Sequence, residues 1–262
     1  MDRIQSEFAF PLKESKFQFK IIRGVKIMTD MHCHIIPFVD DGSRSMEASL
    51  EMLREEVRQG VNRIICTPHY RRGFYERSEE EIKNVFDELS ENARKEGIPV
   101  ELYLGREVKF HTKEYKSFLE KRVVPTMCGG DYVLLEFNYD RETDIDEVVY
   151  DTQMAGYKPI IAHIERYSYF RKVENVARIK AAGAMIQVNA DSIASKDFPK
   201  ERKFVKQLLK FKLADFVGSD VHGGRVNYMK KAYDKVAKKD RGYADMIFDK
   251  NADLIIGQNR PL

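Results

Sequence analysis

The feature that most constrains the fold of this chain is a repeated alternation of short β-branched runs with amphipathic helical patterns. Such strict alternation favours an α/β fold with a parallel sheet, and about seven units favour a closed, TIM-like barrel over a long open sheet. The predicted strands cover residues 27–31, 61–66, 100–104, 132–137, 159–162, 184–188 and 215–218. The predicted helices cover residues 46–57, 82–93, 144–155, 173–182, 203–212 and 228–238.

A doubly wound open sheet is the alternative fold for the same alternation. Such sheets commonly bind nucleotides through glycine-rich loops, but no GxGxxG follows a predicted strand here and no GxxxxGK[ST] occurs. The barrel is therefore the preferred architecture.

Start and stop signals support two of the predicted helices. Ser43 or Ser45 offers an N-cap for the first helix, and Gly60 can end it. Ser78 and Glu81 form a capping-box pattern before the second helix. Each helix is thus expected to lead directly into the strand that follows it.

The composition is typical of a single soluble domain. Its 262 residues suit a barrel of this kind, and a net charge of +3 gives no reason to expect nucleic acid as a partner. The three cysteines show no paired framework and no run of about 18 apolar residues occurs, so we expect a cytoplasmic protein without direct membrane insertion. Residues 1–27 lack periodicity and are interpreted as an N-terminal extension of unknown role before a domain at 28–262.

The ends of the predicted strands carry an unusual set of polar residues. In barrels of this kind the functional side chains lie at the carboxyl ends of the strands. Here those positions are occupied by His32, His34, His69, Glu107, Glu136, His163, Asp220 and His222. Each residue alone has an ordinary structural explanation, but their repetition over six of the seven units indicates a metal centre.

Two local features strengthen the metal interpretation. His32 and His34 form a His-x-His pair, which on a strand points both imidazoles to the same side. Glu136 interrupts an apolar run, and a buried carboxylate is costly unless it is paired or metal-bound.

The ligand types also suggest which ions the centre would hold. Nitrogen and oxygen donors without a thiolate favour Mn, Fe, Zn or Co. Eight candidates exceed the needs of one ion, so we expect two or three divalent ions. Such a cluster attracts an anion and can lower the pKa of bound water toward about 7, which suits hydrolysis of phosphate esters.

Six stretches carry a family resemblance: DMHCHIIPFVDDG, GVNRIICTPHY, LGREV, YVLLEF, PIIAHIERY and GSDVHGGR. Together they resemble the PHP-domain (polymerase and histidinol phosphatase) superfamily, and within it the bacterial tyrosine-protein phosphatases of the CpsB/YwqE type from capsular and exopolysaccharide clusters. The resemblance implies a distorted (β/α)7 barrel, a trinuclear centre that is often manganese, and phosphotyrosine hydrolysis by a metal-bound hydroxide. It also implies that the substrate is a membrane-associated bacterial tyrosine kinase that regulates polysaccharide synthesis.

The resemblance assigns roles to further residues. The eight residues at the strand ends would be the metal ligands, and Asp41 would be either a ligand or the proton donor to the leaving group. Arg166 and Arg225 match arginines that clamp phosphate, and a planar guanidinium can bind it bidentately.

Two features near the candidate site have less certain roles. Arg71 and Arg72 lie in an aromatic-rich loop that could receive an acidic phosphopeptide, although a solvated basic loop is equally consistent with the sequence. His111 matches no family ligand and is expected behind the ligands or on the surface.

Three other functions remain open on the sequence alone. Cys66 and Arg72 satisfy the Cys-x5-Arg spacing of cysteine-dependent tyrosine phosphatases, but Pro68 lacks the N–H that a phosphate-binding loop needs. A phosphatase of a small phosphomonoester such as histidinol phosphate is the alternative within the superfamily. A non-catalytic metal-holding module is disfavoured because every ligand position is intact.

Overall fold

A computed structural model describes residues 28–257, so the predicted extension 1–27 and residues 258–262 lie outside the described part of the chain. All strand pairs are parallel and form two sheets, ordered β1-β2-β4 and β3-β5-β6-β7-β8-β9. The strands are β1 (Thr29–Cys33), β2 (Arg63–Cys66), β3 (His69–Tyr70), β4 (Glu101–Leu104), β5 (Glu107–Lys109), β6 (Tyr132–Glu136), β7 (Lys158–Ile161), β8 (Met185–Asn189) and β9 (Phe216–Gly218).

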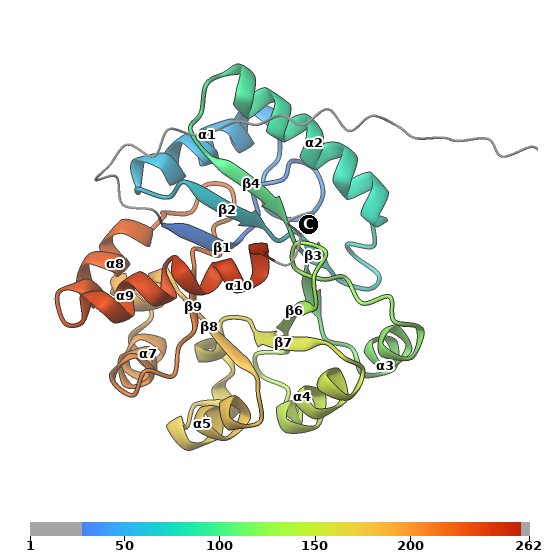
Figure 1. Cartoon of the computed structure of the whole chain (residues 1–262), viewed down its shortest axis with the longest axis vertical. Coiled ribbons are helices and arrows are strands. Elements are labelled where there is room, and N and C mark those ends of the chain that lie inside the picture. Colours follow the sequence, from blue (N-terminus) through green and yellow to red (C-terminus); the bar gives the residue numbers. More distant parts are fainter. Residues whose placement is uncertain (1–27, 258–262) are drawn as a thin grey trace, which may run out of the picture.

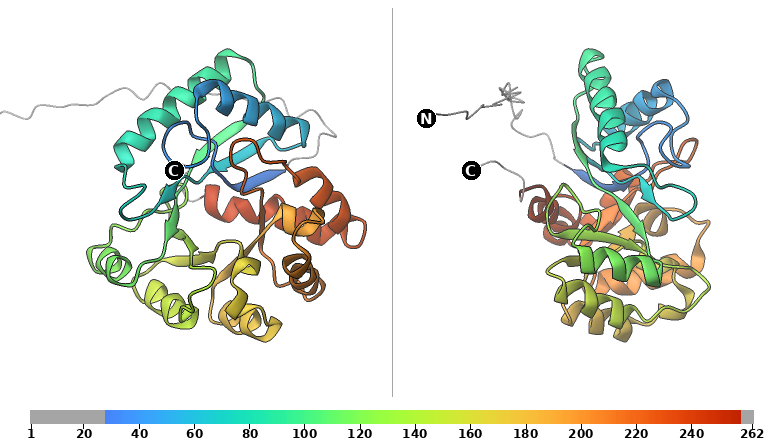
Figure 2. Two further views of the ribbon diagram at one scale, coloured as in Figure 1. Left: turned by 180° about the vertical axis from the view of Figure 1, so that it is seen from behind. Right: turned by 90° about the vertical axis from the view of Figure 1, so that its right-hand side faces the viewer.

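The helices surround a curled array of strands (Figures 1 and 2). They are α1 (Met46–Arg58), α2 (Glu79–Lys95), α3 (Thr112–Lys121), α4 (Ile145–Met154), α5 (Val173–Ala181), α6 (Ala190–Ala194), α7 (Pro199–Lys210), α8 (Met229–Ala237), α9 (Arg241–Ile247) and α10 (Asp253–Ile256). Short 3-10 turns occur at η1 (Ile164–Arg166), η2 (Ser168–Phe170) and η3 (Lys250–Ala252). Helices around the outside of a curled sheet argue against a doubly wound arrangement. Within residues 28–257 no helix is both long and apolar enough to span a bilayer.

The two sheets are connected because two strands continue, after a break, beyond their predicted ends at residues 66 and 104. The second predicted strand continues from β2 into β3, and the third continues from β4 into β5. The pairing carries across both breaks, from Cys66 opposite Leu104 to His69 opposite Glu107. The broken strands therefore bend together and let the sheet curl.

The predicted closed seven-stranded barrel is seen only in part. At the remaining seam, β1 and β9 are linked by a single bridge between Cys33 and Val221, with a 3.0 Å bond from His34 N to Val221 O. The amide of Asp220 also donates to His32 O at 2.8 Å. The prediction of an α/β fold with a parallel sheet is confirmed, whereas residues 28–257 show no continuous ladder that closes the barrel between β1 and β9.

The predicted elements are present with ends shifted by a few residues, but several helices were missed. The capping box of α2 is formed, and Ser45 rather than Ser43 caps α1 by accepting from Ala48 N at 3.1 Å. The sequence prediction omitted α3, α6, α9 and α10. In α3 only Tyr115 and Leu119 are buried, so its apolar pattern is weak.

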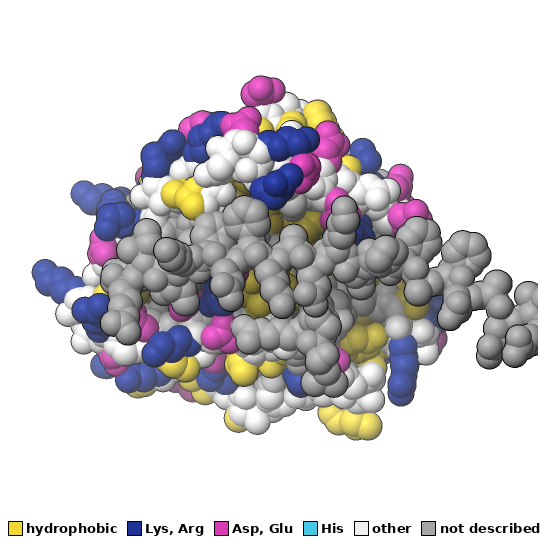
Figure 3. Space-filling model, turned by 45° about the horizontal axis from the view of Figure 1, so that its top comes forward, with side chains coloured by type: hydrophobic (Ala, Val, Ile, Leu, Met, Phe, Trp, Pro, Cys, Tyr) yellow, Lys and Arg dark blue, Asp and Glu magenta, His cyan; other side chains and the backbone are white. Residues whose placement is uncertain are grey.

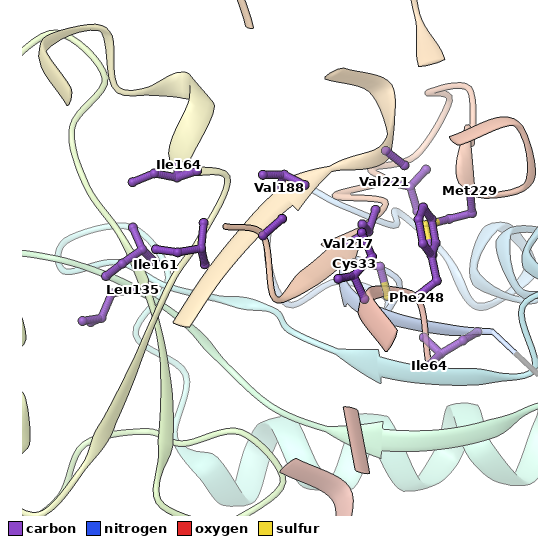
Figure 4. Close-up of a cluster of buried hydrophobic side chains, with 14 of the residues drawn as sticks. Cys33, Ile64, Leu135, Ile161, Ile164, Val188, Val217, Val221, Met229 and Phe248 are labelled. Carbon is purple, nitrogen blue, oxygen red and sulfur yellow. The ribbon is translucent and has the colours of Figure 1, made fainter. Parts of the chain in front are cut away.

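The core consists of two apolar layers. An inner cluster lies within the curl of the strands and includes Met31, Ile65, Leu134, Ile160 and Phe216, together with Ala252, Ile255 and Ile256 from the C-terminal turns. An outer cluster lies between strands and helices, and part of it is shown in Figure 4, where Leu135, Ile161, Val188 and Val217 are labelled. The α10 turn thus covers the inner cluster, and Figure 1 shows it across the middle of the strands.

The packing of α10 predicts different effects for two neighbouring substitutions. Ile255 is 0% exposed and Leu254 is 50% exposed. We expect Ile255→Ala to lower the free energy of unfolding by about 2–5 kcal/mol, because it leaves a cavity in the inner cluster. Leu254→Ala should change it by less than about 0.5 kcal/mol. Urea unfolding of both variants checks this, and equal effects would contradict the described position of α10.

Candidate metal centre

A bulge in β1 brings both histidines of the His-x-His pair into the interior. The register runs from Asp30 opposite Ile64 to Cys33 opposite Cys66, so one extra residue is present on β1. An extra residue resets the alternation of side chains. Met31 can therefore pack in the inner cluster while His32, the next residue, also points inward and meets His34, with 3.2 Å between their Nε2 atoms.

Glu107, the first residue of β5, lies at the centre of the cluster. Its Oε2 atom is 3.3 Å from His32 Nε2, 3.4 Å from His34 Nε2 and 2.9 Å from His69 Nδ1. Its other oxygen, Oε1, is 2.9 Å from His163 Nε2. Four imidazoles from the ends of three strands, β1, β3 and β7, thus converge on one buried carboxylate.

The convergence shapes the ionisation of the cluster. Burial alone would raise the pKa of Glu107, but His32, His69 and His163 hold that pKa well below its usual range. Burial alone would lower the pKa of His34, but carboxylates, first among them Asp40, raise that pKa well above its usual value. The pocket therefore holds anionic carboxylates close together at neutral pH, an environment that attracts cations.

A second group lies beside the first, around the end of β9. Asp220 Oδ1 is 3.5 Å from His34 Nε2 and 3.7 Å from His222 Nδ1. Asp41, which is half exposed, places Oδ1 3.5 Å from His69 Nε2 and 3.6 Å from His222 Nε2. These residues extend the cluster toward solvent.

Glu136, at the end of β6, is the last of the predicted ligands and lies near His69. Its Oε2 atom is 3.9 Å from His69 Nδ1, while Oε1 accepts from Tyr139 OH at 2.7 Å and lies 3.0 Å from Lys109 Nζ. The sequence analysis expected this buried carboxylate to be paired or metal-bound, and the structure pairs it with a lysine and a tyrosine.

Three overlapping groups have donor atoms spaced closely enough to hold metal ions. They are His34, Asp41, His69 and His222; His32, His34 and Glu107; and His69, Glu107 and Glu136. His163 and Asp220 lie against these groups through Glu107 and His34. Because His34, His69 and Glu107 each belong to two of these groups, the groups are adjacent parts of one centre.

Two buried atoms in the middle of the cluster support this fit. His69 Nδ1 and Glu107 Oε2 are 2.9 Å apart, yet neither forms a hydrogen bond with any described residue. Buried polar atoms rarely lack a partner, because an unsatisfied donor or acceptor costs about 1–3 kcal/mol. An imidazole nitrogen and a carboxylate oxygen are both suitable ligands for divalent Mn, Fe, Zn or Co, so a bound cation would give each atom a partner.

Backbone conformation also sets the cluster apart. His163 has φ 29° and Asp220 has φ 51°, values that non-glycine residues rarely adopt. Each residue lies two positions after the last residue of a strand at the carboxyl edge of the sheet, His163 after β7 and Asp220 after β9. Gly218 is required nearby, because a Cβ there would lie 2.6 Å from His32 Cβ. Such strain persists where the surrounding structure holds it, and it is concentrated at functional sites.

Several residues that orient the cluster were missed by the sequence analysis. Asp40 Oδ2 is 2.8 Å from His34 Nδ1 and accepts from His69 N at 3.0 Å. Gln187 Oε1 is 3.2 Å from His32 Nδ1, and Asn189 Nδ2 donates to Asp220 Oδ2 at 2.8 Å. Tyr167 OH is 3.3 Å from His163 Nδ1.

Their sequence signal was present but weak. Gln187 and Asn189 are polar residues two apart in an otherwise apolar strand, and they belong to the unit that supplied no candidate ligand. Asp40 adjoins Asp41, so the sequence alone could not assign their separate contacts. Partners of this kind fix the orientation of metal-binding imidazoles and carboxylates.

The predicted arginines occupy different positions. Arg166 lies beside the cluster, with Nη2 3.3 Å from Asp220 Oδ2 and 3.5 Å from Asp191 Oδ2. The side chain of Arg225 is exposed and makes no contact of this type with other residues of the 28–257 range, although its amide donates to His222 O at 3.1 Å.

The remaining predicted residues lie on the surface near the cluster. Arg71 and Arg72 are exposed in a turn that ends at Tyr75, whose ring stacks 5.8 Å from that of His69. Arg71 also lies over the Phe74 ring, at 4.2 Å. His111 is exposed at the start of α3, in agreement with a surface position.

Cys66 is not placed for nucleophilic catalysis. It is 0% exposed and faces the outer apolar cluster opposite Cys33, on the other side of the strand from Ile65 in the inner cluster. A phosphate ester in solvent cannot reach this sulfur. The Cys-x5-Arg alternative is therefore wrong.

The chain was compared with protein families and with known proteins. Residues 28–257 match the family model for capsular polysaccharide synthesis, CpsB/CapC. The tyrosine-protein phosphatase CpsB of Streptococcus pneumoniae is 35% identical over 221 residues, covering 81% of this chain and 90% of that protein. The tyrosine-protein phosphatase YwqE of Bacillus subtilis is 31% identical over 233 residues, covering 87% and 91% respectively.

A solved structure is similar over nearly the same range. It comes from work on YwqE of Bacillus subtilis and CpsB of Streptococcus pneumoniae, described as unique metal-dependent tyrosine phosphatases. The match has a TM-score of 0.80 at 30% identity and covers 90% of this chain and 96% of that one. Fold, sequence and cluster agree, and this chain belongs to the CpsB/CapC family of capsular polysaccharide synthesis proteins.

Proposed function

We propose that this chain is a metal-dependent phosphatase that hydrolyses phosphotyrosine in proteins. The observation that carries the proposal is the pair of unsatisfied buried atoms, His69 Nδ1 and Glu107 Oε2, within the converging imidazoles. Relatives at 31–35% identity that are named tyrosine-protein phosphatases support the substrate class.

The eight residues predicted from the strand ends, together with Asp41, would hold two or three divalent ions. We propose that these ions are manganese. Bound ions of this kind supply Lewis-acid activation of water and of phosphoryl oxygens. Asp40, Gln187 and Asn189 keep the ligand side chains in position. Asp41 is proposed as a ligand, because its carboxylate lies among three imidazoles.

Arg166 is proposed to bind the phosphoryl group. Its guanidinium is aimed at the carboxylate of Asp220, which itself lies among the candidate ligands. A guanidinium beside the site can donate to equatorial phosphoryl oxygens, where negative charge gathers in the transition state. Arg225 would reach the same group from the exposed rim three residues after His222.

The protein part of the substrate would approach over the exposed turn that contains Arg71 and Arg72. Tyr75, which ends that turn, stacks on His69 and so connects the turn directly to the cluster. We propose that the substrate is a membrane-associated tyrosine kinase and that this chain acts in the cytoplasm. We also propose that the catalytic domain spans residues 28–262 and that its barrel is completed across the seam between β1 and β9. The family's link to capsular polysaccharide synthesis supports the choice of partner.

Removal of the central carboxylate should weaken metal binding. We expect Glu107→Gln to lower metal affinity more than about tenfold, because even outer partners of metal ligands contribute about 10–100-fold. Metal content measured by mass spectrometry, and the rise in Tm on adding Mn, Fe, Zn or Co to chelated protein, check this. Glu101→Gln, at an exposed position on β4, is the matched control. Equal metal content in the two variants would remove Glu107 from the centre.

Substitution of the phosphate-binding arginine should reduce turnover without emptying the site. Arg166→Lys keeps the charge but loses the planar fork, so we expect kcat/KM on a phosphotyrosine peptide to fall about 100-fold. The exposed ion pair of Arg178 with Asp146 makes Arg178→Lys a suitable control. Unchanged kcat/KM in Arg166→Lys would rule out a role for this arginine.

Substitution of the buried cysteine should leave catalysis intact. We expect Cys66→Ser to retain kcat within about twofold per folded molecule, with some loss of stability because a hydroxyl is buried there. His34→Ala, by contrast, should abolish activity and lower metal content. Rates normalised to folded protein check both, and loss of activity in Cys66→Ser with full metal content would refute the metal mechanism.

The alternative substrate within the superfamily is separable by direct comparison. Turnover of a phosphotyrosine peptide and of histidinol phosphate would be measured on the same metal-loaded preparation. A higher kcat/KM on histidinol phosphate would overturn the tyrosine-phosphatase assignment while leaving the metal centre in place.

A further inference from the structure

A cluster of four cations lies outside the metal centre, where α6, α7 and α8 meet. It consists of Lys196, Arg202, Lys231 and Lys235, and we call it the α6–α8 cation cluster. Lys235 Nζ donates to Ile193 O at 3.3 Å and Ala194 O at 3.2 Å, and Arg202 Nη1 donates to Ser195 O at 3.3 Å. Lys235 and Arg202 thus contact the end of α6, Lys196 follows Ser195 in the sequence, and Lys231 lies one helical turn before Lys235 on α8.

These four positive charges have no carboxylate partner within the described residues. The nearby acids are engaged elsewhere: Asp197 accepts from Ser195 Oγ, Glu201 pairs with Arg171, and Asp234 pairs with Lys230. The pKa of Lys235 is lowered by burial and by the neighbouring positive charges of Lys231, Arg202 and Lys196. Mutual repulsion of this kind is relieved when an anion binds.

The cluster stands out from the rest of the surface. Residues 196–239 contain 13 Lys and Arg but five Asp and Glu, whereas the whole chain has a net charge of +3. On α1, by contrast, Arg54 and Arg58 pair with neighbouring glutamates, and Figure 3 shows basic and acidic side chains intermixed on the face it presents.

The cluster is also connected to the metal centre through a short path. Asp191, near the start of α6, lies 3.5 Å from Arg166, and Lys235 contacts the end of the same five-residue helix. Because a helix rises about 1.5 Å per residue, the three residues from Asp191 to Ala194 add only about 5 Å to this path. Phe198, an exposed aromatic that lies between Lys196 and Arg202 in the sequence, has Arg166 5.9 Å from its ring.

We propose that the α6–α8 cation cluster binds an acidic segment of the same protein substrate, about four residues from the phosphotyrosine. An extended peptide advances about 3.3 Å per residue, so four residues reach about 13 Å, enough for the path from Arg166 along α6 to Lys235. Phe198 offers an apolar contact for the intervening residues. This inference rests on the proposed function and adds a sequence preference to it.

The test compares phosphopeptides that differ only in charge. One set carries three Glu beginning four residues before or after the phosphotyrosine, and the matched set carries Gln. We expect the favoured acidic peptide to have about tenfold higher kcat/KM, mainly through KM, with a preference that declines as salt increases. Free phosphotyrosine, which cannot reach the cluster, is the internal control.

Charge reversal locates the effect. Lys196 and Lys231 are exposed and donate no hydrogen bond to another described residue, so Lys196→Glu/Lys231→Glu should remove the preference without unfolding the protein. Lys206→Glu/Lys210→Glu, farther along α7, makes the same change in charge and should keep the preference. Turnover of free phosphotyrosine should be the same in both variants.

Binding of a fluorescent, unphosphorylated acidic peptide, followed by anisotropy on the metal-loaded enzyme, separates this inference from the proposed function. Binding that is lost in Lys196→Glu/Lys231→Glu supports the cluster even if no phosphotyrosine substrate is hydrolysed. Equal affinity for the Glu and Gln peptides overturns it. Binding to vesicles with anionic lipid, without a preference for the acidic peptide, would also overturn it in favour of a membrane surface.

Discussion

The convergence of four imidazoles on the buried carboxylate of Glu107 is the interaction on which the rest of the site depends. A carboxylate in an apolar interior is costly, and this cost is offset only if positive or partly positive partners surround it. Those partners come from the ends of three strands, so the site exists only when the sheet curls and brings these ends together. Fold and chemistry are therefore inseparable in this chain.

Local distortions allow the convergence. The bulge in β1 turns His32 inward next to Met31, and the breaks between β2 and β3 and between β4 and β5 bend two neighbouring strands together. His163 and Asp220 adopt unusual positive φ values at the ends of their strands. The His163 amide donates to Gln187 Oε1 and Asn189 Nδ2 donates to Asp220, and these hydrogen bonds help to hold the two conformations.

The arrangement also separates two kinds of positive charge. Arg166 lies against the acidic cluster and pairs with Asp220 and Asp191, whereas the α6–α8 cation cluster has no such partners among the described residues. The first kind is suited to a phosphoryl group that enters the metal centre. The α6–α8 cation cluster is suited to anionic groups that remain at the surface. Helix α6 connects this cluster to Arg166.

The sequence by itself determined the alternation of seven strands with six of the helices and the residue types at the strand ends, because apolar periodicity and the polar residues at strand ends are local properties. It did not reveal α3, whose buried face consists of two residues, or the contacts of Asp40, Gln187 and Asn189. The contacts of these three residues depend on which strand ends face each other in the folded sheet. Only the tertiary structure decided that Cys66 is buried, that Arg225 is exposed and that four cations from three separate segments gather beside α6, because packing between distant segments sets exposure and proximity.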